Sequence, residues 1–469
     1  MNLSALPRRG FLGNLSAGLG SIALASLMPR GSAGAAVPPH APKAKRVIQL
    51  FMNGGASQCD LFDYKPGLIA GHGKKFDPGS GLRVEASVSV PGALMKSPFG
   101  WAQHGQCGRW VSSALPHLAK QVDEMAFLMA MQSASNVHGP ASYLQTSGFV
   151  LPGFPCAGAW ISHALGSLAD NVPAFVALPD VRGLPYNGRS AFTSGFLPAN
   201  HQGTIIQASA PQPMTHLQPP AGATHITPAS RADGLALLRG MNAAHAAERA
   251  DDTRLTARLE SYELAARLQL SAPELLDLAG ETGATRKLYG LDHAETADFG
   301  KRCLLARRMV ERGVRFVQVW SGAGGGADNW DNHGDIPKEL SAAARKMDQP
   351  AAALLVDLKA RGLLEDTLLI WTTEFGRMPF TQGNSLGRDH NGGTFVSWFA
   401  GAGVKAGTAH GQSDEWSWKA AEGATTSYDF HATMLHLLGI DHETLSFRHS
   451  GIDRRLTDVH GQVIHEILA

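Results

Sequence analysis

The sequence predicts an α/β fold in which a mainly parallel sheet lies between layers of helices, with irregular and helical insertions. Short apolar runs of strand length alternate with longer segments of helical periodicity, as they do in βα units. Several of these apolar runs end in polar, glycine-containing loops, as strands do at the carboxyl edge of a parallel sheet. Because large α/β enzymes often use a length such as 469 residues for one core, we expect a single domain over residues 46–469, with insertions around residues 180–295.

The first half of the chain contains three expected strands. Residues 47–52 form an apolar run that stops at the sequence NGG, where glycine favours a tight loop. Residues 115–131 predict a helix followed by the strand MAFLMAM, and residues 173–178 predict a third, short strand. Residues 180–235 are rich in Gly, Pro, Ser, Asn and Thr, which is typical of irregular insertions.

The second half predicts long helices that alternate with strands. Residues 240–270 carry apolar side chains about four positions apart, a spacing that predicts one long amphipathic helix. Two further helices, at residues 297–312 and 338–361, each end at a glycine and lead into an apolar strand. The other expected elements are strands at residues 314–320, 366–373 and 394–401 and a helix at residues 427–440.

The composition excludes some classes of function. The formal charge is +1, from 41 basic and 40 acidic residues, so the chain lacks the basic excess of a nucleic-acid-binding protein. Its 20 histidines are of interest because imidazole is both a proton shuttle and a common metal ligand. The four cysteines fit no CxxC metal or redox motif, and disulfides and buried free thiols are both open for them.

Residues 1–36 have the layout of a twin-arginine export signal. An arginine pair at positions 8–9 precedes a modest apolar stretch and a small-residue site at positions 33–35. The apolar stretch is interrupted by Gly, Asn and Ser and is too short for a transmembrane anchor. We therefore expect periplasmic or secreted localisation through the twin-arginine (Tat) translocase, and a Pro-rich linker at residues 37–45. Since this route carries folded proteins, often with a cofactor inserted, it favours a metalloprotein.

Five polar clusters follow the expected strands. Because the carboxyl ends of parallel strands lie at one edge of a sheet, these segments are expected to meet there. They cover residues 53–63, 135–142, 328–335, 374–377 and 389–390.

The segment DNWDNHG offers Asp328, Asp331 and His333. A carboxylate and an imidazole two positions apart on a loop can reach one cation. The alternative is that Asp and Asn cap the following helix. Two aspartates, one histidine and a preceding glycine run together favour the metal site.

Glu374 and Arg377 come directly after an expected buried strand, in the sequence TTEFGR. They could form a structural ion pair, because a buried carboxylate needs a partner. A carboxylate at the carboxyl end of a strand is equally well placed for metal ligation or acid-base catalysis. The two interpretations stay open on these residues alone.

Two further segments supply candidate nucleophiles and bases. The segment GGASQCDLFD contains Ser57, Asp60 and Asp63, and NVHGPASY contains His138 and Ser142. A lone His or Ser in a loop is usually neither a nucleophile nor a base. The chain has no GxxxxGK[ST], GxGxxG, GxSxG or HExxH motif, which argues against nucleotide binding, α/β serine hydrolases and zincins.

The pair Asp389-His390, in GRDHNGG, is either a metal-binding or catalytic pair or a salt-bridged turn between two strands. Its position after several other polar clusters favours a metal ligand at His390. Asp389 would then be a ligand itself or would orient the imidazole.

Six segments of the chain resemble the motifs of one family, DUF1501, a family of exported bacterial proteins. In order they are FMNGGASQCDLFDYKP, NVHGPASYLQTSGF, WDNHG, TEFGR, GRDHN and FRHSGIDRRLTDVHGQVIHEIL, which together span essentially the whole mature chain. That family in turn resembles the alkaline phosphatase and sulfatase superfamily, whose members hydrolyse phosphate or sulfate esters with one or two divalent metals. The resemblance implies an alkaline phosphatase/sulfatase-like core and divalent metal, with zinc, manganese, calcium and magnesium not distinguished.

The superfamily resemblance also implies a set of metal ligands. Its acidic ligand on the first strand falls near Asn53, an amide here, so that Asp60 or Asp63 would substitute for it. Glu374 stands where an Asp-His-Gly motif is expected. The implied ligands are Asp331, His333, Glu374, Asp389 and His390, with Asp60 as a bridging ligand.

The nucleophile is where the chain departs most from the superfamily. His138 stands at the nucleophile position and no arginine follows Pro140, so no formylglycine-type modification is implied. Ser142 or Ser57 would replace the missing alcohol, water activated by a metal would attack directly, or catalysis has been lost.

These observations lead us to expect a metal-dependent hydrolase of small phosphate or sulfate esters. Arg377 would bind the anionic substrate, and His138 would act as general acid or base. The alternative is an exported binding or surface-assembly protein that keeps the fold without the chemistry.

Overall fold

Strand β1 (Arg46–Met52) lies in the middle of the main sheet. Every residue of β1 after Arg46 is buried, as expected of a strand that is covered on both faces. It runs parallel to both neighbours, with Val47 opposite Phe316 of β8 (Phe316–Ser321) on one side and Leu368 of β9 (Thr367–Thr372) on the other.

This computed structural model describes residues 40–79, 84, 90–210, 212–214, 222–223, 227–249, 253–325 and 328–469. The expected export signal at residues 1–36 lies outside these ranges, as do the first three residues of the expected linker.

In the described ranges, nine strands form the main sheet, in the order β13-β5-β12-β9-β1-β8-β6-β7 with β16 paired to β5. β12 (Phe395–Ala400) runs antiparallel to both β5 and β9, and the other pairings are parallel. The prediction of a mainly parallel sheet is therefore confirmed. The remaining strands are β5 (Met125–Gln132), β6 (Phe175–Leu178), β7 (Thr204–Ile205), β13 (Thr408–His410) and β16 (Thr425–Thr426).

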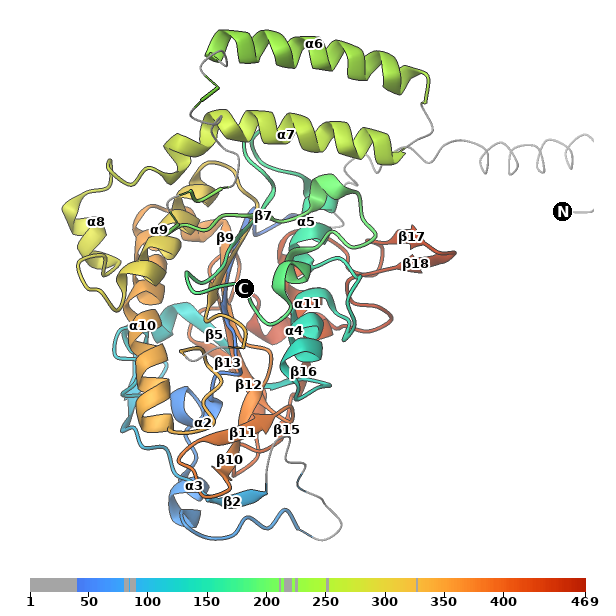
Figure 1. Cartoon of the computed structure of the whole chain (residues 1–469). Helices are drawn as coiled ribbons and strands as arrows, with labels where there is room; N and C mark the ends of the chain where they lie inside the picture. The colour runs from blue at the N-terminus through green and yellow to red at the C-terminus, as the bar shows by residue number, and fades with distance from the viewer. Residues whose placement is uncertain are drawn as a thin grey trace, which may run out of the picture. The chain divides into compact units, whose positions relative to one another are not determined.

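Helices cover both faces of this sheet (Figure 1). Because side chains alternate along a strand, Ile48 and Leu50 pack in one hydrophobic cluster and Val47 and Phe51 in another. The first cluster includes α9 (Ala297–Glu311) and α10 (Ile336–Ala360), and the second includes α5 (Ala157–Leu165) and α11 (Ser427–Leu437). This two-sided burial fixes the register of the sheet, and with it the edge at which the strands end.

The helical insertion differs from the sequence prediction. Instead of one helix over residues 240–270, the structure has α6 (Pro228–Ala247) and α7 (Thr253–Leu276). The single-helix prediction was wrong because the spacing of apolar residues does not show where one helix ends and the next begins. The helix expected after residue 115 is a 3₁₀ segment, η1 (Leu118–Glu124). The other helices are α2 (Gln58–Leu61), α3 (Pro66–Gly71), α4 (His138–Ser147), α8 (Gly283–Leu288) and the 3₁₀ segments η2 (Gly188–Phe192), η3 (Ala199–His201), η4 (Leu363–Glu365) and η5 (His465–Ile467).

A small antiparallel sheet, in the order β11-β10-β2, extends from the segment that follows β9. It contains β2 (Pro91–Leu94), β10 (Gly376–Gln382) and β11 (Arg388–Asn391). Asp389 and His390 therefore lie on a buried strand, which excludes the alternative of a turn between two strands. Three further ribbons pair β3 (Trp101–His104) with β4 (Arg109–Ser112), β14 (Gln412–Ser413) with β15 (Ala420–Glu422), and β17 (Phe447–His449) with β18 (Ile452–Arg454).

The described residues also show the state of the cysteines and whether any helix there could cross a membrane. All four cysteines are free thiols, and Cys59, Cys156 and Cys303 are buried. None of the helices in the described ranges combines the length and the apolar character that crossing a membrane requires.

Candidate metal centre

The carboxyl ends of three strands of the main sheet, together with one antiparallel hairpin, supply the candidate site. His138 follows β5 as the first residue of α4, and Glu374 follows β9 after one intervening residue. Asp331 and His333 lie in the loop between β8 and α10. The hairpin of β10 and β11 returns His390 to the same place, where it pairs with Arg377.

Four of these side chains converge on one point. His138, Asp331, His333 and His390 each offer one ligand atom, and these atoms all lie within 4.8 Å of one another. Around Oδ1 of Asp331, Nε2 of His333 lies at 2.7 Å, and Nε2 of His138 and Nε2 of His390 each lie at 3.1 Å. Nε2 of His333 and Nε2 of His390 are 2.8 Å apart.

The hydrogen bonds of the three imidazoles define which nitrogen carries the proton. Nδ1 of His390 donates to the carbonyl oxygen of Asn136 at 2.8 Å, and Nδ1 of His138 donates to Oε1 of Glu374 at 2.8 Å. The far nitrogen of each ring is thereby occupied and Nε2 is directed at the cluster, where it donates to Asp331 when it carries a proton and can bind a cation when it does not. The Arg377 guanidinium, which can only donate, lies 3.4 Å from Nε2 of His333 and directs a lone pair there as well.

This arrangement fits a bound cation. Three imidazole lone pairs and a carboxylate oxygen are a donor set for a transition metal. Nε2 of His138 is buried and has no hydrogen-bond partner, although it lies 3.1 Å from Asp331. Nε2 of His333 and Nε2 of His390 are 2.8 Å apart, a separation that fits either a proton shared between them or two lone pairs on one bound cation.

Glu374 orients His138 through Nδ1, the ring nitrogen that faces away from the cluster. Its carboxylate is fully buried and also accepts hydrogen bonds from the backbone N–H of Gly54 at 2.8 Å and from Oγ1 of Thr373 at 3.1 Å. A carboxylate that accepts from the far nitrogen of a metal-binding imidazole fixes the ring and increases its basicity. The sequence placed Glu374 among the metal ligands. In the structure it contacts the far nitrogen of His138 and does not belong to the cluster, so its place is that of an orienting residue.

Two glycines let the β1 loop approach the site. Gly54 and Gly55 have φ of 121° and 75°, which only glycine adopts readily. A Cβ on Gly54 would lie 2.6 Å from the backbone nitrogen of Asp331, and a Cβ on Gly55 would lie 2.6 Å from the ring of Phe375. The NGG sequence thus brings the Gly54 amide against Glu374 without displacing Asp331.

The N–H donors of Arg377 bind other groups of the protein. Its Nη2 donates to Oδ1 of Asp331 at 2.6 Å and to the carbonyl oxygen of Gly54, and its Nε donates to the carbonyl oxygen of Gly55 at 2.8 Å. Its Nη1 donates to the carbonyl oxygen of Arg388 at 3.0 Å, and the side chain is 0% exposed. A guanidinium with no exposed donor does not bind a substrate anion, so that expectation from the sequence does not fit the structure.

The electrostatics of the cluster follow from these contacts. Burial works against the ionised form of Asp331, but the close contacts with His138, His333 and His390 and the Arg377 charge hold its pKa far below the usual range. Burial lowers the pKa of His390 to about 4. Burial also opposes protonation of His138, but Asp331 and Glu374 outweigh it and raise the pKa of this imidazole. Asp331 is therefore a permanent anion that faces imidazole nitrogens.

A family model described as "Protein of unknown function (DUF1501)" matches residues 44–468. The chain belongs to the DUF1501 family. No curated protein shows significant similarity to it.

Solved structures resemble this DUF1501 protein only distantly. A lipoteichoic acid synthase, LtaP, from Listeria monocytogenes has a TM-score of 0.38 and 8% identity over 85% of this chain and 72% of its own. The PsFucS1 sulfatase from Pseudoalteromonas sp. has a TM-score of 0.35 and 13% identity over 92% and 70%. A protein in the alkaline phosphatase superfamily from Vibrio parahaemolyticus has a TM-score of 0.37 and 10% identity over 87% and 69%. Values this low describe a distant likeness of fold and say nothing about a shared activity.

One residue of the DUF1501 site was missed by sequence reasoning. Tyr186, from the irregular insertion, stacks on His138 with ring centroids 4.1 Å apart and an interplanar angle of 4°. Its hydroxyl donates to Oδ2 of Asp331 at 3.2 Å and accepts from Nδ2 of Asn329 at 3.0 Å. No local pattern marks Tyr186, because its partners are distant in the sequence.

Several predicted site residues lie outside the cluster. Asp60 is fully buried and pairs with Arg388, and Oγ of Ser57 donates to Asp60 at 2.6 Å. Asp63 accepts hydrogen bonds from Ser413 and Ser417. These contacts are those of structural residues, not of a bridging ligand and an alcohol nucleophile.

Four other predicted site residues also lie outside the cluster, and their contacts or burial show where they are. Nδ2 of Asn53 donates to the carbonyl oxygen of Gly322, and Oδ1 of Asp389 accepts from the His390 backbone amide at 2.7 Å. Ser142 is buried one helical turn from His138, and Asp328 pairs with Arg182 and Lys346 at 3.5 Å each. Neither Asp328 nor Asp389 belongs to the group of His, Cys, Asp and Glu side chains that could hold a metal ion among the described residues.

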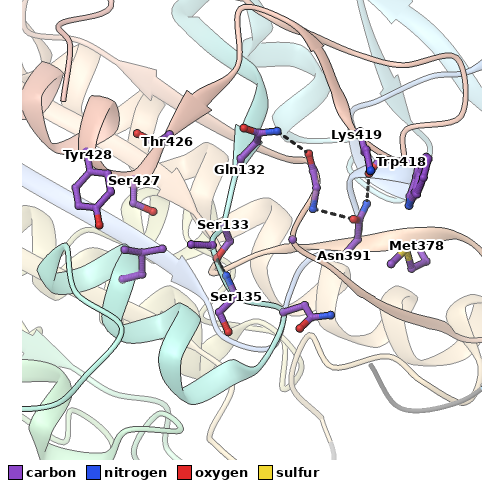
Figure 2. Close-up of a pocket in the computed structure, with 15 residues that line it drawn as sticks. Gln132, Ser133, Ser135, Met378, Asn391, Trp418, Lys419, Thr426, Ser427 and Tyr428 are labelled. Atoms are coloured by element: carbon purple, nitrogen blue, oxygen red, sulfur yellow. Dashed lines mark hydrogen bonds between the residues drawn. The ribbon is translucent and has the colours of Figure 1, made fainter. Parts of the chain in front are cut away.

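A polar cavity of ≈ 460 Å³ adjoins the loop that supports His390 (Figure 2). Asn136, whose carbonyl oxygen accepts from His390, lines it together with Asn391. Its lining combines hydroxyl and amide side chains such as Gln132 and Ser133 with apolar ones such as Trp418, and none of the described residues that line it is acidic. The cavity has the size of a small-molecule site.

Proposed function

We propose that this DUF1501 protein is an exported metal-dependent hydrolase of phosphate or sulfate esters. One observation carries the proposal: three imidazole Nε2 atoms surround Oδ1 of Asp331, at the carboxyl edge of a parallel sheet. The arginine pair and apolar stretch within residues 1–36 support the export part.

The ligand side chains are partly open to solvent. The side chains of Asp331 and His333 are 24% and 27% exposed, whereas those of His138 and His390 are 12% and 8% exposed. A small ester can therefore approach from the side of Asp331 and His333. A divalent ion held by the four residues would polarise the ester oxygen and lower the pKa of water bound to it.

Water is the nucleophile that the geometry supports best. Ser57 is buried against Asp60, and Ser142 is 1% exposed within α4, so neither hydroxyl is open to a substrate. His138 is held by Glu374 on one ring nitrogen and faces the cluster with the other, which suits a ligand. The ester class is proposed because attack by water on a phosphorus or sulfur centre needs a cation to balance the oxygens of the ester.

The second candidate is a non-catalytic binding protein that keeps the metal. Two observations favour it: no exposed alcohol lies in the cluster, and the Arg377 guanidinium is saturated by the protein. Metal binding alone does not separate the two functions, whereas hydrolysis does.

The test uses the full chain, exported and processed in a host with a twin-arginine pathway. We expect at least one equivalent of divalent metal by elemental analysis and hydrolysis of p-nitrophenyl phosphate or p-nitrophenyl sulfate. Both are expected to be lost in His390→Ala and kept in His293→Ala, which removes an exposed imidazole elsewhere. Metal without hydrolysis of any ester supports the binding protein, and a metal-free native protein rejects both functions.

A further inference from the structure

We infer that Arg377 is a built-in second cation of this site, so that the cluster holds a single metal ion of the zinc type and not a pair of ions. This inference rests on the metal cluster of the proposed function. It adds the number of ions, their chemical class and a role for Arg377.

The donor set selects the class of metal. Three imidazole nitrogens and one carboxylate oxygen are ligands that zinc takes in proteins, and zinc can expand to five-coordinate to accept water as well. Magnesium and calcium take six or more oxygen ligands, which His138, His333 and His390 do not provide. Among the described residues this is the one group of His, Cys, Asp or Glu side chains able to hold a metal ion.

The guanidinium of Arg377 lies where a second cation would have to bind. It is 2.6 Å from Oδ1 of Asp331, the oxygen shared by all three imidazoles. Carbonyl oxygens of Gly54, Gly55 and Arg388 complete its surroundings. Oxygens on several sides are what a hard cation requires, and here they bind a fixed organic cation instead.

Electrostatics then exclude a second divalent ion. Arginine keeps its charge at any pH at which proteins fold. Because the side chain is 0% exposed, its charge is poorly screened by salt. A second ion bridged through Asp331 would lie within a few ångströms of both the guanidinium and the first ion, and both would repel it.

The alternative is that Arg377 is only a structural clamp for the loops at Gly54 and Asp331. The two roles predict opposite effects on the metal when the charge is removed. Loss of a clamp loosens Asp331 and weakens metal binding, whereas loss of a neighbouring positive charge strengthens it. Arg377→Lys and Arg377→Met form a matched pair, because both lose the planar fork and only methionine loses the charge.

The first measurement is the metal stoichiometry of the wild-type full chain, by titration of the metal-free protein with Zn²⁺ and by elemental analysis after gel filtration. We expect one equivalent of Zn²⁺, not displaced by millimolar Mg²⁺ or Ca²⁺. Two equivalents, or displacement by Mg²⁺ or Ca²⁺, would overturn the inference and leave the proposed function standing. No bound metal would reject both.

The second measurement compares Zn²⁺ affinity in the matched pair by competition with a chromophoric chelator. We expect Arg377→Met to bind Zn²⁺ at least tenfold more tightly than Arg377→Lys, or to accept a second equivalent. Equal affinities, or weaker binding by Arg377→Met, would show that Arg377 is only a clamp. If neither variant folds, the wild-type stoichiometry and metal preference decide.

Discussion

Arg388 and Asp60 form a bidentate ion pair in the interior of the protein, with Nε 2.7 Å from Oδ2 and Nη2 3.0 Å from Oδ1. Both side chains are 0% exposed. The pair ties α2, behind the β1 loop, to β11, the strand that carries His390. A carboxylate that uses both oxygens on a guanidinium has little left to offer a metal.

Asp60→Ala is therefore expected to destabilise the fold and leave the metal site intact. An unpaired buried guanidinium typically costs about 3 to 5 kcal/mol in the free energy of unfolding, measured by urea denaturation. The matched control is Asp453→Ala, which removes an exposed pair with Arg448 and should cost about 1 kcal/mol or less. Loss of metal from a folded Asp60→Ala protein with unchanged stability would assign Asp60 to the metal instead.

Glu374→Gln tests the orienting role of this carboxylate. The amide keeps the shape of Glu374 but loses the charge that faces Nδ1 of His138 and the Gly54 amide. Loss of such an orienting partner typically weakens metal affinity by about 10- to 100-fold, which chelator competition measures. Glu365→Gln, at an exposed position, serves as the control. An unchanged affinity in Glu374→Gln would remove this residue from the metal centre.

Stability is expected to fall in mild acid because two histidines are buried in the neutral form. Burial lowers the pKa of His431 and of His201 from 6.5 to about 4. Between these values the unfolded chain binds protons that the folded chain does not, so stability is full above the unfolded pKa and is lost as pH falls toward 4. For His431, at about 1.4 kcal/mol per pKa unit, the loss is about 3 kcal/mol.

The variant His431→Leu removes one of the two histidines that bind a proton more readily in the unfolded chain than in the folded chain. Urea denaturation between pH 7 and pH 4 should show a shallower decline than in the wild type, whereas His293→Ala should follow the wild-type curve. Identical slopes in His431→Leu and the wild type would mean that the pKa of His431 is the same in the folded and the unfolded protein.

Local sequence patterns predict the strands and the polar segments of this protein, but not the roles within the site. Residues 47–52 have the buried, uninterrupted apolar pattern that becomes β1, and the rule for strand ends brings Asp331 and His333 to the right edge. The roles depend on partners far along the chain, which no local period encodes. Asp60 pairs with Arg388, which lies 328 positions away in the sequence, and Tyr186 donates a hydrogen bond to Asp331 from an irregular insertion.

Gly54→Ala is expected to disturb the metal centre through its backbone. The new Cβ would lie 2.6 Å from the Asp331 nitrogen, at a φ of 121° that alanine rarely adopts. Strain and overpacking together should cost about 2 to 5 kcal/mol and displace Asp331, so that metal affinity falls as well. The control is Gly73→Ala, which has a φ of 81° but open space around the new Cβ, and should cost about 1 kcal/mol with no change in metal affinity. Equal effects of the two substitutions on metal affinity would show that the approach of Gly54 to Asp331 does not shape the site.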